Sequence, residues 1–148
     1  MAHPEAGTGF TLRLERTIAA PPERVFDAWT DPATVARWFG PTDQYVCTLT
    51  APEIRVGAPW RIDMVHSGGN HHVAEGTYLE IARPSRLSFS WGFRHMPELD
   101  RTVVTVILEP IPTGTRLVLL HERFPTAELR ERHNQGWDPA LDKLVRLF

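Results

Sequence analysis

The sequence has little of several features that would narrow its role, and each shortage excludes a class of protein. One cysteine, Cys47, is present among the 148 residues, so no internal disulfide can form. No apolar run approaches the roughly 20 residues that cross a bilayer. The first ten residues lack the charged start and apolar middle of a signal peptide. We therefore expect a cytoplasmic protein that makes no membrane contact.

Charge of one sign is also scarce. The net charge is -2, the pI is near 6.4, and Lys and Arg never form a run. Binding to a phosphate backbone requires clustered positive charge, so we expect no nucleic-acid partner. The hydrophobic content of 42% and the charged content of 23% are those of an ordinary globular chain. They predict a single domain over residues 1–148, with residues 1–8 as a flexible N-terminus.

Signatures of catalysis and metal binding are missing as well. The chain has no nucleophile–base motif, no paired-acid signature and no phosphate-binding loop. Three of the seven histidines, His66, His71 and His72, flank the hairpin loop expected at 67–70. A stable metal site needs three or four ligands in fixed geometry, and no Cys or carboxylate stands at ligand spacing. We expect these histidines to be solvated, and we expect no metal and no cofactor.

What the sequence does contain is a repeated alternation of apolar and polar residues, which is typical of β-strands. The expected strands span 10–18, 45–51, 58–66, 71–82, 87–93, 101–111 and 115–122. Segment 101–111 is apolar on both faces, which predicts a central strand covered on both sides. Gly76, inside segment 71–82, is expected to mark a β-bulge.

Helix signals follow the first strand. The apolar residues of segment 23–30 recur at helical spacing, which predicts a short helix. Asp31 and Pro32 then predict the start of a second short helix, because Asp caps free N–H groups and Pro suits a first helical position. Gly40 and Pro41 end it.

A longer helix is expected over 127–147, with Thr126 as its N-cap. At 1.5 Å per residue it would span about 30 Å, enough to cross a sheet. Its apolar stripe consists of Leu129, His133, Gly136, Trp137, Ala140, Leu141, Leu144 and Phe148. Pro139 cannot donate the backbone hydrogen bond that the helix needs there, so a kink or a full break is expected near 136–138.

Several stretches of the sequence, covering nearly the whole chain in order, are similar to one known family. They are Arg16–Pro32 with Arg37–Pro41, Gly76–Trp91, and Thr115–His121 followed by His133–Trp137. They resemble the family related to the C-terminal domain of the activator of Hsp90 ATPase, within the START-like (polyketide cyclase/lipid transport) superfamily. The resemblance implies an α+β helix-grip fold. In that fold a curved antiparallel sheet of about six or seven strands wraps a long C-terminal helix, and two short helices follow strand 1.

Aromatic residues are the main candidates for a binding site. Four of the five tryptophans lie on the apolar faces of four different expected elements, so they could converge on one pocket for a small apolar molecule. Each could equally be packed core. The candidate ligand-binding residues are Trp38, Phe39, Trp60, Met64, Tyr78, Trp91, Phe93, His121, His133, Trp137 and Leu141.

Three of these candidates could also carry chemistry. His121 shares a strand face with Leu117, and His133 shares the helix stripe with Trp137, so both are expected to point into the space between sheet and helix. A neutral imidazole there would orient a ligand carbonyl or act as acid or base, with Tyr78 as a third candidate. The alternative is a pair of core histidines that hydrogen-bond to their surroundings.

The leading hypothesis is a carrier or sensor, a stress-related one included, that binds a small hydrophobic or amphipathic molecule between sheet and helix. One alternative is a cyclase, dehydratase or hydrolase acting on a polyketide-like or aromatic substrate. Another is an Hsp90-type co-chaperone, and the lack of room for a second domain argues against that partner. A homodimer through an uncovered edge strand is a further expectation.

Overall fold

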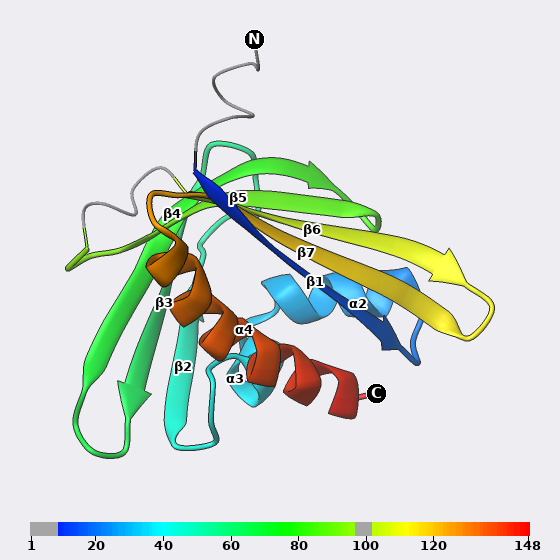
Figure 1. Ribbon diagram of the computed structural model, residues 1–148. Helices are drawn as coiled ribbons and strands as arrows, with labels where there is room; N and C mark the ends of the chain where they lie inside the picture. The colour runs from blue at the N-terminus through cyan, green and yellow to red at the C-terminus, as the bar shows by residue number, and fades with distance from the viewer. Residues whose placement is uncertain (1–8, 97–101) are drawn as a thin grey trace, which may run out of the picture.

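The computed structural model describes residues 9–96 and 102–148, and in this part the chain forms one curved antiparallel sheet with three helices on its concave side (Figure 1). The strand order is β1-β7-β6-β5-β4-β3-β2, and neighbouring strands are antiparallel throughout. The elements are β1 (Phe10–Ile18), α2 (Pro22–Thr30), α3 (Pro32–Trp38), β2 (Tyr45–Thr50), β3 (Pro59–His66), β4 (His71–Ala82), β5 (Arg86–Phe93), β6 (Thr102–Ile111), β7 (Gly114–Phe124) and α4 (Ala127–Arg146). The expected flexible segment 1–8 lies outside the described residues.

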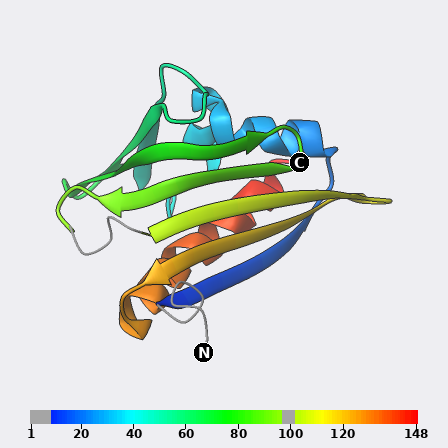
Figure 2. The same ribbon diagram turned by 90° about the horizontal axis from the view of Figure 1, so that it is seen from above.

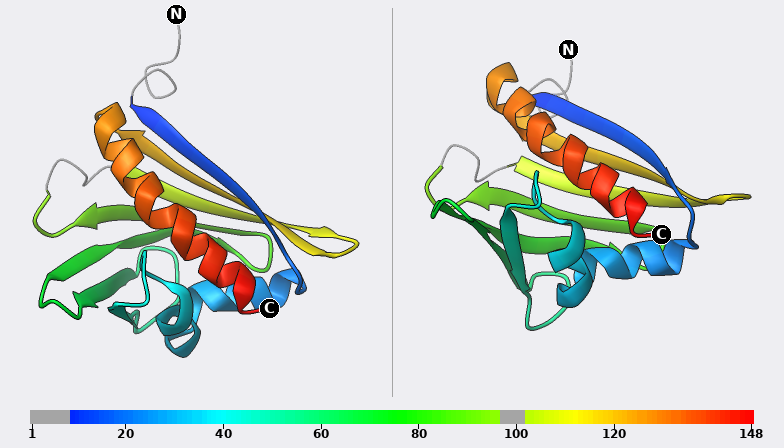
Figure 3. Two further views of the ribbon diagram at one scale, coloured as in Figure 1. Left: turned by 60° about the horizontal axis from the view of Figure 1, so that its bottom comes forward. Right: turned by 90° about the horizontal axis from the view of Figure 1, so that it is seen from below.

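The expected helix-grip architecture is confirmed. Figure 3 shows α4 running across the concave face of the sheet, with α2 and α3 beside its C-terminal half. The alternation of the strands directs one side-chain row of each strand to this face, as with Leu117, Leu119 and His121 of β7, which are fully buried. None of the helices in the described ranges combines the length and the apolar composition that a membrane span requires.

The two short helices begin and end where their sequence signals predict. The Asp31 carboxylate accepts a hydrogen bond from the Thr34 backbone N–H at 3.1 Å, which confirms its role as N-cap of α3. After α3 the chain turns at Gly40, whose φ of +98° is readily adopted by glycine alone. This turn leads into β2, against which α3 packs.

A full break of the C-terminal helix near 136–138, which the sequence left open beside a kink, does not occur. Helix α4 continues through Gly136 and Pro139 to Arg146, and it runs as one rod in Figure 3. Pro139 deprives the Gln135 carbonyl of its helical partner. Because Gln135 is exposed, water can satisfy that carbonyl, and the helix persists.

Arg16 of β1 holds the middle of α4 in place. Its guanidinium pairs with Asp138, on the turn that contains the proline, and its Nε donates to an Asp142 carboxylate oxygen at 3.0 Å. The Arg16 side chain is 19% exposed, whereas the side chains of Asp138 and Asp142 are 52% and 54% exposed, so only the guanidinium is shielded from solvent. Tertiary contacts on both sides of Pro139 therefore support the helix where its own hydrogen bonding is weakest.

The expectation that β6 is a central strand is confirmed, but its outer face is covered only in part: Thr105 on that face is buried, without a second layer of structure among the described elements. Val104, Val106 and Leu108 point inward and are buried, but Val103 and Ile107 on the other face are partly exposed. None of the three described helices lies on that outer face (Figure 2). The apolar outer residues of β6 lie between those of neighbouring strands in the middle of the sheet, which shields them in part without a second layer.

Gly76 does not mark the bulge in β4. The register shifts between Tyr78 and Glu80 instead. A Cβ atom on residue 76 would lie 2.0 Å from the Ser90 carbonyl oxygen of β5, so glycine is required by the close approach of two backbones.

Candidate functional site

A cavity of about 300 Å³ lies between the sheet and the N-terminal half of α4. Most of its wall is aromatic or aliphatic, with polar groups from a few histidines and one arginine. The lining residues are Phe39, Gly40, Pro41, Tyr45, Met64, His72, Trp91, Phe93, His95, Met96, Leu129, Arg132, His133, Gly136, Trp137 and Ala140. We call this the outer cavity. Its size and apolar walls are those of a small-molecule site.

Strand pairing positions the sheet side of this cavity. Met64 of β3 stands opposite His72 of β4, so both side chains share the inner face. Trp91 and Phe93 reach the same face from β5 because they are two residues apart. Adjacent strands thus present thioether, imidazole and aromatic groups to one space.

Helix α4 supplies the opposite wall through residues at steps of three and four. His133, Gly136, Trp137 and Ala140 all line the outer cavity. A Cβ atom added at Gly136 would meet nothing within 4 Å, so the absence of a side chain there leaves space open. The helix therefore combines one large indole with two small residues, and that combination gives the cavity its depth.

Two tryptophan–histidine hydrogen bonds fix the boundary of the cavity. The Trp137 indole N–H donates to His121 Nδ1 at 3.1 Å, and the Trp91 indole N–H donates to His133 Nε2 at 3.2 Å. The other nitrogen of His133, Nδ1, lies 2.9 Å from the Leu129 carbonyl oxygen and donates to it. Each histidine accepts at one nitrogen, so both imidazoles must be neutral, His121 with its proton on Nε2 and His133 on Nδ1.

Electrostatics favour the same neutral forms. Burial lowers the pKa of His121 well below its ordinary value, and the neighbouring His133 lowers it further. Burial also lowers the pKa of His133, against the opposing effect of its bond to Leu129. The two rings lie 5.2 Å apart. His121 Nε2 is buried and has no partner among the described residues.

A second, smaller cavity of about 20 Å³ lies deeper in the molecule, and we call it the inner cavity. Its walls are Trp29, Val35, Trp38, Phe39, Leu49, Trp60, Ile62, Tyr78, Phe89 and Trp91. Phe39 and Trp91 belong to the walls of both cavities, with ring centroids 6.3 Å apart. These two rings therefore stand between the outer and the inner space.

Unpaired donors belong to the walls of the inner cavity. The indole N–H groups of Trp29 and Trp60 are buried and have no partner among the described residues. Trp38, in the same wall, differs because its N–H donates to the Ala28 carbonyl oxygen at 2.9 Å. Burial raises the pKa of Tyr78 to about 12, so its hydroxyl stays protonated at neutral pH.

All five tryptophans form one continuous chain of ring contacts. Trp38 contacts Trp29 with centroids 4.7 Å apart, and Trp29 contacts Trp137 at 6.0 Å. Trp137 contacts Trp91 at 5.4 Å, and Trp91 contacts Trp60 at 5.7 Å. The convergence expected from the sequence is real, but only Trp91 and Trp137 of the five line the outer cavity.

The structure divides the eleven candidate ligand-binding residues into three groups. Phe39, Met64, Trp91, Phe93, His133 and Trp137 line the outer cavity. Trp38, Trp60 and Tyr78 line the inner cavity. His121 and Leu141 are fully buried in the core and line neither of the two. Tyr78 is therefore not brought together with His121 and His133.

The sequence interpretation missed ten residues that line the outer cavity. They are Gly40, Pro41, Tyr45, His72, His95, Met96, Leu129, Arg132, Gly136 and Ala140. Some carried a usable signal. Tyr45 lies two residues before the inward-facing Cys47, and His72 lies two residues before the inward-facing Ala74. Residues two apart share a strand face, so strand periodicity alone would have placed both on the inner face.

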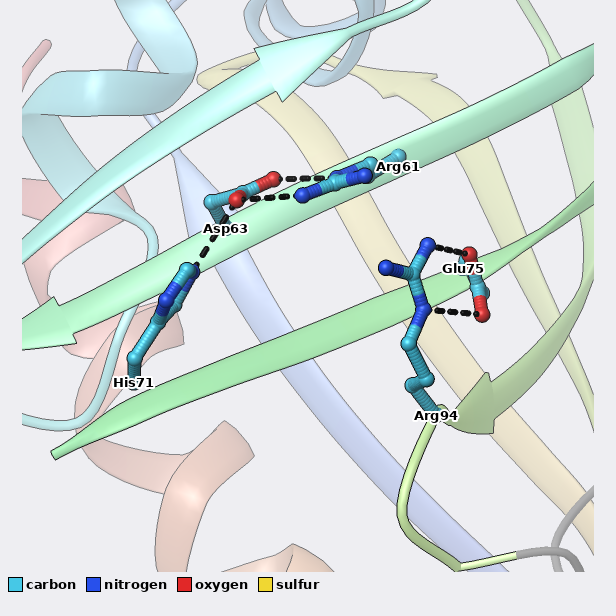
Figure 4. A network of polar contacts seen from close by, with 5 residues as sticks. All are labelled: Arg61, Asp63, His71, Glu75 and Arg94. Atoms are coloured by element: carbon cyan, nitrogen blue, oxygen red, sulfur yellow. Dashed lines mark hydrogen bonds and ion pairs between the residues drawn. The ribbon is translucent and has the colours of Figure 1, made fainter.

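The charged residues of the central strands lie on the outer face of the sheet and not in the cavities (Figure 4). Arg61 donates to Asp63 at 2.6 Å, and His71 lies 3.0 Å from the same carboxylate. Arg94 pairs with Glu75 at 2.8 Å. The bond from Arg61 lowers the pKa of Asp63 to about 2. Ion pairing on the solvated face of the sheet explains these groups, within β3 for Arg61 and Asp63 and between neighbouring segments for His71 with Asp63 and for Arg94 with Glu75.

The hairpin histidines and the cysteine find local partners or burial. His66 bonds Gln44 at 3.0 Å, while His71 bonds Asp63, so the two imidazoles do not face each other. Within residues 9–96 and 102–148, no group of three or more His, Cys, Asp or Glu side chains is arranged to hold a metal ion. Cys47 is buried, which raises the pKa of its thiol to about 11 and disfavours a reactive thiolate.

Comparisons with known proteins agree with the fold described above. Protein CV1439 from Chromobacterium violaceum is 31% identical, with a TM-score of 0.82 over 93% of this chain and 96% of that one. The AHSA1 (SPO3351) protein from Silicibacter pomeroyi is 33% identical, with a TM-score of 0.75 over the same shares. An AHSA1-like protein from Aeromonas hydrophila is 23% identical, with a TM-score of 0.77 over 93% of this chain and 90% of that one, and shows the fold alone.

No curated protein matches the chain. The sequence model of the family described as "Activator of Hsp90 ATPase homolog 1-like protein" matches residues 19–148, which include both cavities and all three helices. The chain therefore belongs to the activator of Hsp90 ATPase homolog 1-like family, and its START-like helix-grip fold is the one expected for that family.

Proposed function

We propose that the protein binds a small hydrophobic or amphipathic molecule in the outer cavity, as a carrier or sensor. The observation that carries the proposal is the cavity of about 300 Å³ between sheet and α4, walled by Trp91, Trp137, Phe39 and Phe93. Burying an apolar ligand of that size against aromatic walls is favourable by about 25 cal/mol for each Å² removed from water. Arg132 and His95 in the same wall offer contacts to a polar end of the ligand.

Binding is favoured over catalysis by the state of the two histidines. His133 lines the cavity, but one of its nitrogens accepts from Trp91 and the other donates to Leu129. An acid or base must exchange a proton with the substrate at a free nitrogen. His121 is fully buried with Trp137 bonded to it. Both side chains thus support the cavity wall in the arrangement described here.

Gly136 provides the test of this function. The Gly136→Leu substitution places a branched side chain in the open space of the outer cavity, whereas Gly136→Ala adds one methyl group only. Both substitutions favour the helix, by about 0.5–1 kcal/mol for alanine. The probe is 2-isopropenylnaphthalene, an uncharged and apolar aromatic compound. We expect Gly136→Leu to weaken its binding about tenfold or more, and Gly136→Ala to retain most of the affinity.

Binding is measured by the change in tryptophan fluorescence on titration, and unfolding curves confirm that both variants are folded. Gln135→Leu, at an exposed position of the same helix, controls for added hydrophobicity. Native mass spectrometry of the freshly purified protein would reveal a co-purifying ligand. Equal affinity of the Gly136→Leu variant and the wild-type chain would contradict the proposed site.

A further inference from the structure

The interior of this protein has an excess of hydrogen-bond donors. Three buried side-chain nitrogen atoms lack a partner among the described residues: Nε1 of Trp29, Nε1 of Trp60 and Nε2 of His121. An indole nitrogen always carries a hydrogen, and His121 carries its proton on Nε2 because Nδ1 accepts from Trp137. All three atoms are therefore donors, and each lacks an acceptor.

Two of these donors belong to the wall of a single cavity. Trp29 and Trp60 are 6% and 4% exposed, and both line the inner cavity. A buried N–H without an acceptor is costly, so native proteins rarely keep one without a reason. Two such groups around one small space point to an acceptor atom that belongs there.

The inner cavity also limits the chemistry of that acceptor. A volume of about 20 Å³ accommodates one atom of the size of a water oxygen. None of the described residues in its wall is charged. A carboxylate oxygen would be buried without a counter-charge, which is strongly unfavourable, whereas a neutral carbonyl oxygen would not be.

The inner cavity is adjacent to the proposed ligand site. Phe39 and Trp91 are wall residues of both cavities, so these two side chains separate the outer cavity from the inner one, and a small shift of either ring would join the two spaces. The Trp60 ring contacts Trp91 with centroids 5.7 Å apart, on the inner side. A flat ligand held in the outer cavity would therefore have only this aromatic partition between itself and the free donors.

We propose that the ligand is an uncharged aromatic ketone or related carbonyl compound, whose ring system fills the outer cavity and whose carbonyl oxygen enters the inner cavity to accept from Trp29 and Trp60. This inference rests on the proposed function, because it names the class of ligand that the outer cavity holds. The protonated hydroxyl of Tyr78 lines the same inner space and is a further donor to that oxygen.

A pair of probes of nearly the same shape separates this inference from the proposed function. The ketone 2-acetonaphthone carries a C=O group where 2-isopropenylnaphthalene carries C=CH₂, so only the ketone can accept a hydrogen bond. We expect both to bind, and the ketone to bind about tenfold tighter, in line with one or two net hydrogen bonds. The carbonyl stretch of the bound ¹³C-labelled ketone should lie at lower frequency than that of the same ketone in hexane, which donates no hydrogen bond.

Variants identify the donors. Trp60→Phe and Trp29→Phe remove the free N–H groups and should bring the ketone-to-alkene affinity ratio close to one. Trp38→Phe removes a similar volume from the same wall, but its N–H already donates to Ala28, so the ratio should persist. The comparison of ketone and alkene affinities in the wild-type chain tests the inference even where a variant fails to fold.

Equal affinities of the wild-type chain for ketone and alkene, or a carbonyl stretch of the bound ketone at its value in hexane, would overturn the inference and leave the proposed function intact. Such a result would mean that water satisfies the two donors. Failure of both probes to bind would instead count against the proposed function and against the carbonyl inference with it. Tighter binding of the charged analogue 2-naphthoate would overturn the requirement for a neutral ligand.

Discussion

At the scale of single residues, His133 in the wall of the outer cavity and the buried His121 each bond a tryptophan of that wall. Each is neutral because it accepts a tryptophan N–H, and protonation would place a hydrogen against that donor. The protonation of His121 is therefore coupled to the position of Trp137, and the protonation of His133 to the position of Trp91. Both tryptophans are walls of the outer cavity. These two differ from the other five of the seven histidines, because their protonation would disturb the packing of the core.

This coupling predicts acid sensitivity. Below the ordinary histidine pKa of 6.5, the unfolded chain takes up a proton at His121 and the folded chain does not. The free energy of unfolding should therefore be constant above this pH and fall as the pH decreases below it, by at most about 1.4 kcal/mol per pH unit for each buried histidine. Denaturant unfolding between about pH 7.5 and about pH 5.5 measures the slope.

His121→Gln should reduce that slope, because a glutamine amide oxygen can accept from Trp137 without titrating. The contribution of His133, whose pKa is lowered as well, should remain. A slope that is unchanged in the variant would mean that His121 does not remain neutral in the folded chain.

At the scale of secondary-structure elements, α4 forms one wall of the site, and its first turn is held by one side chain. The Thr126 hydroxyl accepts from the Leu129 N–H at 3.1 Å, and Leu129 lines the outer cavity. We expect Thr126→Ala to lower the free energy of unfolding by about 1 kcal/mol and Thr126→Ser to retain most of it.

Hydrogen exchange would show where the cap acts. Amide protection should fall over the first turns of α4, up to about His133, and not near Leu144 at the other end. Equal loss of protection along the whole helix would indicate that Thr126 acts on global stability alone.

The elements were predictable from sequence because each depends on local pattern. Alternation located the strands, and Asp31 and Thr126 marked helix starts that the structure confirms. The full break that Pro139 left open does not occur, and the helix there is supported from outside, by Arg16 of β1. A sequence read one segment at a time does not reveal such a long-range contact.

The cavity was predictable only in part, for the same reason. Phe93 and Trp137 were recognised because they are aromatic and lie on apolar faces. Trp38 and Trp60 satisfy the same criterion, yet they lie deeper, around the inner cavity. How far each ring lies from the cavity depends on sheet curvature, which no periodicity encodes. His95 and Met96 follow β5 in a turn, where no regular spacing applies.

At the scale of the whole molecule, the backbones of β4 and β5 approach each other closely at Gly76, in the part of the sheet that lines the cavities. Alanine there would place its Cβ 2.0 Å from the Ser90 carbonyl oxygen, a backbone atom that cannot move aside without its strand. We expect Gly76→Ala to destabilise the protein by about 1–3 kcal/mol or more. Gly136→Ala, which meets nothing within 4 Å, is the matched control and should be neutral or stabilising.

Thermal unfolding of the two variants measures this difference. The register of Glu75 with Gly92 and of Tyr78 with Phe89 places Gly76 opposite Trp91, which lines both cavities, so Gly76→Ala should also weaken ligand binding. A Gly76→Ala protein as stable as the wild-type chain would show that the two strands can separate without cost.

The unbroken chain of tryptophan contacts gives the protein an optical property. Excitation energy passes efficiently between indoles in contact, so light absorbed by any one of the five rings is shared with the others. A molecule that touches Trp91 or Trp137 would then quench the emission of the entire set, including rings that it never meets. The same aromatic packing should give a strong near-ultraviolet circular dichroism signal that changes when the cavity is filled. The protein thus carries its own reporter of occupancy, and no added label is needed to find what it binds.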